Sequence, residues 1–502
     1  MKKAFTLIEL LAVIAIIAIV GLITSPMISD ILENSEKGAF EDSVQGIIKA
    51  IDIDKANGGF NINRVYTMTN GVIAPDIDYK NSFDGSGVIK LDEDGNISVV
   101  IQYDKWCATK DYNSKAVTVK IETCVFNSDT SLANEPYLMT NMVPIKWDGT
   151  KWIRADSRNP STNKWYDYNL VQWANVALVK EVGSNTRKYY LSDDALGVEV
   201  REIDILAYFV WIPRYNYAIS SGVGARTISI NFEEGIPDHA TGNAVDANYL
   251  THPAFIFGTR ELTGFWFGKF ETTGTLSSIT VKPNLAALTN NQLLSTYISM
   301  DNIYDTNNVY GLPKASADAR ISKNIEWAAV SYLTQSIYGV NSQLWKNNST
   351  TYITGCAGSS VTAAGSAGCA NAYTTTNGLK ASSTGNIYGV YDMAGGTNEV
   401  VMANYKKTAA ESGITSFPNA KYFDQYTTGV TTTACFNLSC YGHGLYEVSG
   451  WYSGLNTFVN YTYPWVIRGS NSTSAISSQY EYNYYDGAAS TSVGFRLTLS
   501  SK

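Results

Sequence analysis

The sequence predicts an α+β protein in which one long N-terminal helix and a β-rich region precede a larger, irregular α+β domain. Three observations lead to this prediction. An uncharged apolar run passes into an amphipathic pattern over residues 5–56, strand–turn–strand patterns follow over 57–200, and residues 206–499 are rich in Gly, Ser, Thr and Asn. Because the chain has 502 residues, it is too long for one hydrophobic core and is expected to form several folding units.

The start of the chain combines a short basic stretch with an apolar run that begins at an acid. Residues 1–4 contain two lysines, Glu9 follows, and the run from Leu10 to Ser29 carries no charge. A carboxylate at the head of an apolar segment costs roughly 3 kcal/mol in a bilayer and is tolerated mainly where it has a partner or a function. An ordinary signal peptide or single-pass anchor has no reason to carry Glu9.

The second half of the predicted helix is amphipathic and ends at Asn57-Gly58-Gly59, a sequence that stops helices. Charged residues of both signs lie away from the apolar stripe. An isolated helix on a membrane surface is therefore disfavoured, because such a helix needs a basic face. The apolar stripe consists of Ile28, Ile31, Leu32, Phe40, Val44, Ile47, Ile48 and Ile51.

The segment Phe5-Thr6-Leu7-Ile8-Glu9-Leu10 after a short basic leader resembles the prepilin segment of type IV pilins and their relatives. The resemblance implies cleavage between Ala4 and Phe5 by a prepilin peptidase and methylation of the new amine of Phe5. It also implies that Glu9 pairs with the amine of a neighbouring pilin subunit in the filament. Ala4 departs from the family, where glycine is usual, but alanine is small enough that we still expect processing. Pro26 stands where many pilins carry a helix-kinking proline.

Residues 57–200 are predicted to form a β-rich pilin head, on which the amphipathic half of the helix packs in that family. The strands Val88–Leu91 and Ile97–Tyr103 flank a Glu93-Asp94-Gly95-Asn96 turn and predict a hairpin. A second strand–turn–strand pattern, with an Asp-Gly turn, spans residues 143–152. The aromatic residues here are expected to build a small core rather than a binding site.

The six cysteines form three pairs that are close in the sequence. Their even number and the export segment favour disulfides. Many connectivities are open, and we favour the three local ones because each pair lies within one apparent module. A zinc site is disfavoured, since no pair has CxxC spacing and the chain has three histidines. The predicted pairs are Cys107/Cys124, Cys356/Cys369 and Cys435/Cys440.

The charge balance bears on possible partners. The net charge is −8, and charged residues make up only 16% of the chain. An acidic surface does not neutralise phosphates, so we expect no nucleic-acid partner. Abundant Tyr, Trp and Gly fit an extracellular, loop-rich protein.

Separated aromatic and glycine-rich pieces recur in a fixed order over residues 206–499. Together they resemble the formylglycine-generating-enzyme-like (sulfatase-modifying factor) superfamily, a variant of the C-type-lectin fold. The YGVYDMAGG segment (388–396) and the terminal Gly494-Phe495-Arg496 are the most specific. The other pieces are FVWIP (209–213), FWFGKFETT (265–273), EWAA (326–329), Asn398-Glu399 and VIRGS (466–470).

The resemblance implies mainly structural roles for the charged residues of these pieces. We expect Asp392 and Arg496 to form a buried charge pair and Arg468 to serve another carboxylate. Glu399 falls at the glutamate of the family's WEW segment, a region that helps to hold calcium in some members. A calcium role for Glu399 is therefore a hypothesis, although the family's tryptophans are replaced here.

Catalysis is not expected. The superfamily's oxidase binds copper through a cysteine pair near the RGGS segment, and this chain has no cysteine after Cys440. The iron-dependent relatives need a histidine triad, whereas His239, His252 and His443 lie outside that motif. Sugar-binding C-type lectins use EPN or QPD for calcium, and neither occurs, so "lectin" describes a fold only.

A stretch rich in Tyr, Ser and Asn precedes the terminal GFR. In the targets of diversity-generating retroelements, which share the fold, such a stretch forms a ligand-binding face. Tyr beside Ser, Asn and Gly is also typical of antibody-type binding surfaces. The alternative is that these tyrosines fill a core with little aliphatic content. The predicted ligand-binding residues are Tyr480, Tyr482, Asn483, Tyr484, Tyr485, Asp486, Trp451 and Tyr461.

These inferences predict a large, minor type IV pilin-like protein that displays a non-catalytic module for adhesion or recognition of an unknown extracellular ligand. The precursor is expected in the inner or cytoplasmic membrane as a single-pass protein, and the mature protein in a cell-surface pilus. A type II secretion pseudopilin with a structural terminal domain is the first alternative. A surface enzyme with an unrecognised site is the second.

Overall fold

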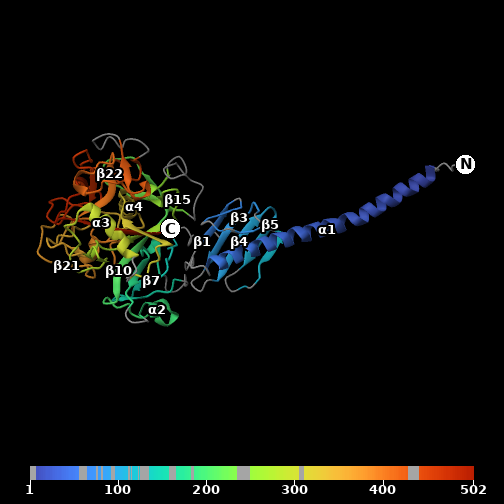
Figure 1. Ribbon diagram of the computed structural model, residues 1–502, viewed down its shortest axis with the longest axis horizontal. Helices are drawn as coiled ribbons and strands as arrows, with labels where there is room; N and C mark the ends of the chain where they lie inside the picture. The colour runs from blue at the N-terminus through green and yellow to red at the C-terminus, as the bar shows by residue number, and fades with distance from the viewer. Residues whose placement is uncertain are drawn as a thin grey trace. The chain divides into compact units, whose positions relative to one another are not determined.

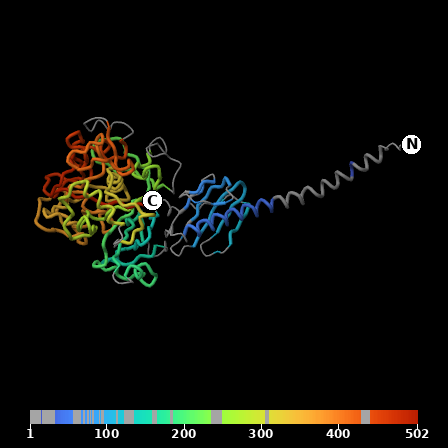
Figure 2. The backbone as a smooth tube through the Cα atoms, in the orientation of Figure 1, coloured from blue at the N-terminus to red at the C-terminus, as the bar shows by residue number. Residues whose placement is uncertain are grey.

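The computed structural model divides the chain into two compact units, residues Met1–Ser128 and Asp129–Lys502, and each is described by itself (Figures 1 and 2). For residues 7–13, 16–32, 65, 67, 69, 74 and 90 only the backbone is described. The structure describes residues 7–55, 65–69, 71–74, 77, 79–80, 83–91, 96–110, 114, 116–121, 124, 135–157, 165–181, 186–233, 249–304, 310–427 and 440–502.

The N-terminal unit consists of one long helix and one antiparallel sheet. Helix α1 spans Leu7–Asp54, close to the predicted 5–56. The sheet has the strand order β2-β1-β3-β4-β5-β6, and the predicted hairpin at 88–103 is its β3–β4 pair. The strands are β1 (Val65–Thr69), β2 (Val72–Ala74), β3 (Ser86–Leu91), β4 (Ile97–Tyr103), β5 (Trp106–Lys110) and β6 (Thr118–Ile121).

The amphipathic half of α1 packs on this sheet through an apolar core. Phe40, Val44, Ile47 and Ile51 are at most 3% exposed and meet the inward-facing residues of the strands. On β4, burial alternates with partial exposure, as expected for a strand with one face on a core. The helix stripe predicted from Phe40 to Ile51 is therefore confirmed as the buried face.

Among the residues whose side chains the structure describes, no helix is both long and apolar enough to cross a membrane. Glu9 and most of the predicted membrane segment belong to the part of α1 for which only the backbone is described. The predicted cleavage residues Ala4 and Phe5 lie outside the described residues.

The C-terminal unit is built on an antiparallel sheet with the strand order β19-β27-β16-β10-β9-β7-β8. Its first strands come from residues that the sequence assigned to the pilin head, because β7 and β9 pair with each other and β9 pairs with β10. The boundary at Ser128 thus replaces the expected one near residue 200. The strands are β7 (Met142–Trp147), β8 (Trp152–Arg154), β9 (Asn175–Val179), β10 (Ile205–Pro213), β16 (Gly264–Gly268), β19 (Ala317–Ile321) and β27 (Leu497–Ser501).

A second sheet, with the order β23-β22-β24-β25, carries the C-terminal sequence pieces. Its central strand β22 runs antiparallel to β24 and parallel to both β23 and β26. These strands are β22 (Asn398–Tyr405), β23 (Asp424–Tyr426), β24 (Trp465–Arg468), β25 (Tyr482–Tyr485) and β26 (Val493–Phe495).

The remaining strands form small sheets. The order β12-β11-β13 is antiparallel, and three two-stranded hairpins complete the unit. These strands are β11 (Tyr215–Ile219), β12 (Ile228–Phe232), β13 (Leu250–Thr251), β14 (Ile256–Phe257), β15 (Arg260–Glu261), β17 (Thr273–Thr275), β18 (Ser278–Thr280), β20 (Cys356–Ala357) and β21 (Asn371–Ala372).

Short helices accompany these sheets. Helices α2 (Thr186–Leu191) and α3 (Leu293–Ser299) are brief, whereas α4 (Asn324–Thr334) has 11 residues and contains the EWAA piece. Every side chain of α4 is buried. A helix without a solvent-facing side lies inside its unit, so α4 is the central element around which the loops pack.

Two of the predicted disulfides are present. Cys107 on β5 is bonded to Cys124, and Cys356 on β20 is bonded to Cys369. Each bond joins residues of the same unit, as the sequence spacing suggested. The third predicted pair includes Cys435, which lies outside the described residues.

Candidate functional site

The terminal Arg496 is a fully buried hub of the C-terminal unit. Its guanidinium binds both carboxylate oxygens of Glu399 and donates to the carbonyls of Gly268 and Tyr391, each at 2.9 Å. This corrects the expected pairing with Asp392. The reason lies in the sheet: β26 runs parallel to β22, so Gly494 stands beside Glu399 and Arg496 follows two residues later.

Asp392 has partners of another kind. Its carboxylate accepts from the Asn347 side chain at 2.8 Å and from the Gly355 amide at 2.7 Å. Arg468 was expected to serve a carboxylate, but among the described residues its hydrogen bonds go to the Asn324 side chain and to backbone carbonyls. Burial lowers the pKa of Arg468 to about 10. Asp392 and Arg468 thus hold segments of the C-terminal unit together through buried hydrogen bonds.

The environment of Glu399 bears on the calcium hypothesis. Glu399 is 0% exposed, and both of its oxygens face the guanidinium of Arg496. A cation at this carboxylate would have to displace an existing buried ion pair, which is costly. Within the described residues, no group of three or more His, Cys, Asp or Glu side chains is arranged to hold a metal ion. The calcium role stays a prediction.

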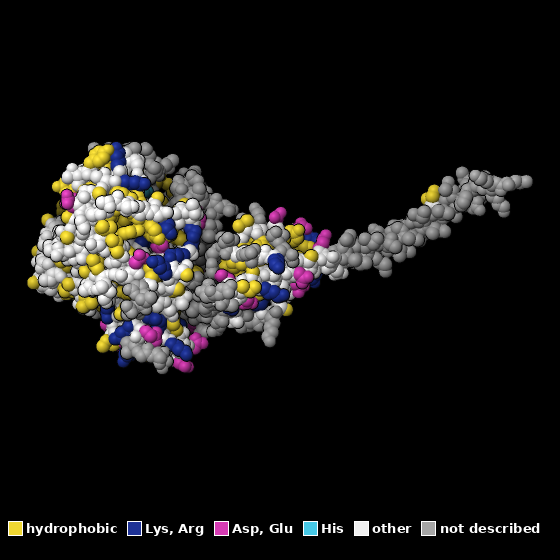
Figure 3. Space-filling view, in the orientation of Figure 1, with side chains coloured by type: hydrophobic (Ala, Val, Ile, Leu, Met, Phe, Trp, Pro, Cys, Tyr) yellow, Lys and Arg dark blue, Asp and Glu magenta, His cyan; other side chains and the backbone are white. Residues whose placement is uncertain are grey.

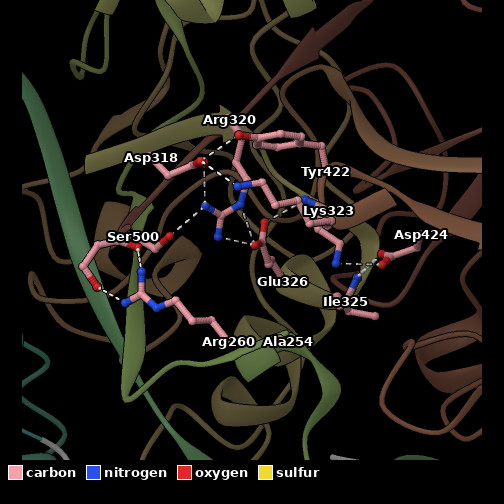
Figure 4. A network of polar contacts seen from close by, with 12 residues as sticks. Ala254, Arg260, Asp318, Arg320, Lys323, Ile325, Glu326, Tyr422, Asp424 and Ser500 are labelled. Carbon is pink, nitrogen blue, oxygen red and sulfur yellow. Dashed lines mark hydrogen bonds and ion pairs between the residues drawn. The ribbon is translucent and has the colours of Figure 1, made fainter. Parts of the chain in front are cut away.

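A second buried network connects the two main sheets of the unit at the start of α4 (Figure 4). Arg320 on β19 donates to Glu326 at 2.9 Å and to Asp318 at 3.2 Å, and it also reaches Ser500 on β27. Tyr422 closes the other side with a 2.9 Å bond to Asp318. Because the charges are mutually paired and nearly inaccessible, the network is suited to holding elements together rather than to chemistry on a ligand.

The two histidines within the described residues are also internal. His252 is 0% exposed, and its Nδ1 accepts from the Ala254 amide at 3.2 Å. His443 lies 3.0 Å from the Tyr426 hydroxyl, and burial lowers its pKa to about 4. Neutral imidazoles held this way behave as structural side chains. His239 lies outside the described residues.

Three of the predicted ligand-binding residues belong to the core, which corrects the prediction for them. Tyr480, Tyr482 and Trp451 are 1%, 1% and 4% exposed. The Tyr480 hydroxyl donates to the carbonyl of Ser331 on α4 at 2.9 Å, and its ring meets that of Trp451 at 5.2 Å. The segment around Tyr480 therefore packs on the central helix, and the alternative that these aromatics fill the core holds for this part.

The other predicted residues lie nearer the surface. Tyr461 is 58% exposed, whereas Asn483, Tyr484, Tyr485 and Asp486 are half-buried. Asn483 to Tyr485 belong to β25, an end strand of its sheet. This part of the prediction retains access to solvent.

The structure adds partners from other segments. The Tyr484 ring stacks on that of Tyr463 with centroids 4.6 Å apart, and the Lys406 Nζ donates to the Tyr461 hydroxyl at 3.0 Å. We call Lys406, Tyr461, Tyr463 and Tyr484 the tyrosine face. Lys406 was missed because it lies 55 residues before Tyr461. Only the pairing of β22 with β24 brings the two segments together, and no local sequence signal records that pairing.

Comparison with known proteins bears on the other end of the chain. Residues 1–25 match the family model of the prokaryotic N-terminal methylation motif. The chain carries a prepilin segment. This supports a type IV pilin-like or pseudopilin-like protein with a membrane-anchored precursor, and is consistent with other pilin subunits and a prepilin peptidase as partners. No curated protein matches the chain.

Proposed function

We propose that this protein is a minor type IV pilin-like subunit whose C-terminal unit is a non-catalytic binding module for adhesion or surface recognition. The observation that carries the proposal is the combination of a prepilin segment with a large separate unit that exposes the tyrosine face. A filament subunit that needs only to assemble has no use for a second unit several times larger than its head.

The proposal includes a formylglycine-generating-enzyme-like fold for the C-terminal unit. The order of its sequence pieces supports this, and so does the way in which they meet: the terminal Arg496 binds Glu399 of the Asn398-Glu399 piece, and Lys269 donates to the carbonyls of Ile387 and Gly389. Segments distant in the sequence are thus tied by buried polar bonds. A scaffold role for these residues supports recognition rather than catalysis as the activity.

Adhesion and filament assembly can be separated by an in-frame deletion of residues 129–502. The strain with this deletion should still assemble pili, seen by electron microscopy, and should lose attachment to its target surface. The matched control is Glu9→Ala in the full chain, which should impair incorporation into filaments. Unchanged attachment after the deletion contradicts the proposal. Loss of protein secretion, without surface exposure of the C-terminal unit in the wild type, favours the pseudopilin alternative.

A further inference from the structure

The tyrosine face consists of residues held in place before any ligand arrives. Tyr461 and Tyr463 lie on a tight turn in which the Asn460 side chain accepts from the amides of Thr462 and Tyr463 at 2.9 and 3.1 Å. The Tyr463 ring then stacks on Tyr484 at an interplanar angle of 27°. A near-parallel pair fixed by a closed turn forms a flat aromatic ledge, with little conformational entropy to lose on binding.

A lysine borders this ledge at the end of β22. The Lys406 ammonium lies 5.4 Å from the centre of the buried Tyr405 ring and 5.2 Å from that of Tyr461. Lys406 and Lys407 are both exposed, and in the described part of the chain neither forms an ion pair with a carboxylate. Asp486, which follows β25, binds the Ala488 amide at 2.9 Å. Lys406 is thus a cation without a paired carboxylate in the described part of a protein whose net charge is −8.

The backbone that presents the lysines is unusual. Lys406 and Lys407 have φ angles of 52° and 53°, a left-handed conformation that non-glycine residues rarely adopt in succession. The Asn404 side chain holds it, donating to the Thr408 carbonyl at 2.9 Å and accepting from the Thr408 amide at 3.0 Å. Strain that the surrounding structure maintains is often associated with function. Here it presents Lys406, whose ammonium donates to the Tyr461 hydroxyl at 3.0 Å.

We propose that the tyrosine face binds an acidic saccharide, a sugar chain that carries carboxylate or sulfate groups. A sugar ring presents a face of C–H bonds that matches the electron-rich face of a tyrosine ring. Lys406 supplies charge-assisted hydrogen bonds to the acidic groups, and the tyrosine hydroxyls can bond sugar hydroxyls. In Figure 3, hydrophobic and basic side chains lie next to one another near the edge of the C-terminal unit that carries β22.

The size of the face favours a saccharide over an acidic protein. A stable protein–protein interface buries about 800 Å² on each partner around several apolar anchors. The tyrosine face offers two well-exposed rings, Tyr461 at 58% and Tyr463 at 38%, beside the half-buried Tyr484. Such a ledge matches one or two sugar rings. The inference rests on the proposed recognition function and names the ligand class.

The test uses the purified full chain on an array that pairs acidic saccharides with their carboxyl-reduced or desulfated counterparts and includes acidic peptides. The wild type should bind the acidic saccharides, and Lys406→Gln should weaken binding about tenfold. Tyr463→Ala should weaken it similarly because it removes half of the stacked pair. Binding should also fall as salt is raised. Lys380→Gln is the matched control: Lys380 is an exposed lysine 4.2 Å from the centre of the Trp345 ring, away from the tyrosine face, and its loss should leave binding unchanged.

The outcomes separate this inference from the proposed function. Equal binding to acidic and neutral saccharides overturns it, as does binding to the acidic peptides alone or unchanged binding by a folded Lys406→Gln protein. If the pili attach to their target through residues 129–502 but the array shows no acidic saccharide, the saccharide inference fails and the adhesion proposal stands. Thermal unfolding of each variant establishes that it is folded, and Tyr461→Phe gives a second variant that removes only the hydroxyl bonded to Lys406.

Discussion

The two units of this protein are stabilised by interiors of different kinds. The core of the N-terminal unit is apolar, from Phe40 and Ile47 of the helix to Ile89 and Val99 of the sheet. The C-terminal unit also buries whole guanidinium groups. Its fully buried arginines are Arg214, Arg320, Arg468 and Arg496.

The two interiors differ in the sequence separation of the residues that specify them. In the N-terminal unit, a helix stripe and alternating strands specify which faces meet, and both patterns are local. In the C-terminal unit, Arg496 pairs with a residue 97 positions away and Arg468 with one 144 positions away. A buried charge is tolerated only when its partner is in place, so these pairs make distant segments depend on one another.

The largest test of this contrast is Glu399→Ala. The substitution leaves the Arg496 guanidinium buried without its carboxylate, and both residues are 0% exposed. Breaking a buried pair from one side should lower the free energy of unfolding of the C-terminal unit by about 3–5 kcal/mol. Denaturant unfolding followed by tryptophan fluorescence measures this, because Trp106 alone of the 11 tryptophans lies in the N-terminal unit.

Two variants serve as controls for that experiment. Glu399→Gln keeps the shape and one acceptor and should lose less stability than Glu399→Ala. The double variant Glu399→Leu with Arg496→Met removes both charges and should recover part of the loss, since similar apolar replacements are often tolerated. A loss below about 1 kcal/mol for Glu399→Ala is inconsistent with an essential ion pair.

Removing each disulfide should have an effect of intermediate size on stability, and the effect should be confined to the unit that contains it. Cys107 and Cys124 are 17 residues apart, and opening a loop of this length costs about 3 kcal/mol. Replacing both by serine should increase hydrogen exchange in β5 and β6 and leave the tryptophan transition unchanged. The matched pair Cys356 and Cys369, 13 residues apart, should do the reverse. A shift of the tryptophan transition in the first variant would show that the units unfold together.

The same contrast explains what the sequence could predict. The amphipathic half of the N-terminal helix, the β3–β4 hairpin and two disulfides follow from patterns within about 20 residues, and the structure bears them out. The predicted boundary between the two units near residue 200 was wrong. Strands β7 to β9 look like a continuation of the head in sequence, and only their pairing with β10 assigns them to the second unit.

The prediction of several site residues was wrong for a related reason. Tyrosine has an apolar ring and a polar hydroxyl, so it occurs both in cores and on binding surfaces. Composition alone therefore did not separate buried Tyr480 from exposed Tyr461. Asp392 was the expected partner of Arg496, and the parallel register of β22 with β26 brings Glu399 to it instead. Long-range register is the information that a single sequence lacks.

The smallest expected effect concerns Glu481, another buried charge of the C-terminal unit. It is 5% exposed, and its Oε2 has no hydrogen-bond partner within the described residues. Burial raises its pKa to about 7, although the Leu455 backbone and the positive charge of Lys346 oppose the shift. The folded protein therefore holds this proton more tightly than the unfolded chain does, whose glutamate titrates near pH 4.5.

The sign of the pH dependence follows. Stabilisation by the bound proton is fully present below about pH 4.5 and is lost as the pH rises through about 7. His443 acts in the opposite direction, since its lowered pKa of about 4 makes acid destabilising. The informative quantity is thus the stability difference between Glu481→Gln and the wild type, measured by tryptophan fluorescence from pH 4 to 8. As the pH rises from 4 to 8, the free energy of unfolding of Glu481→Gln should increase relative to that of the wild type by about 1–2 kcal/mol, after allowance for solvent screening. A constant difference would mean that Glu481 titrates in the folded protein as it does in the unfolded chain, and that the positive charge of Lys346 offsets the effect of burial on its pKa.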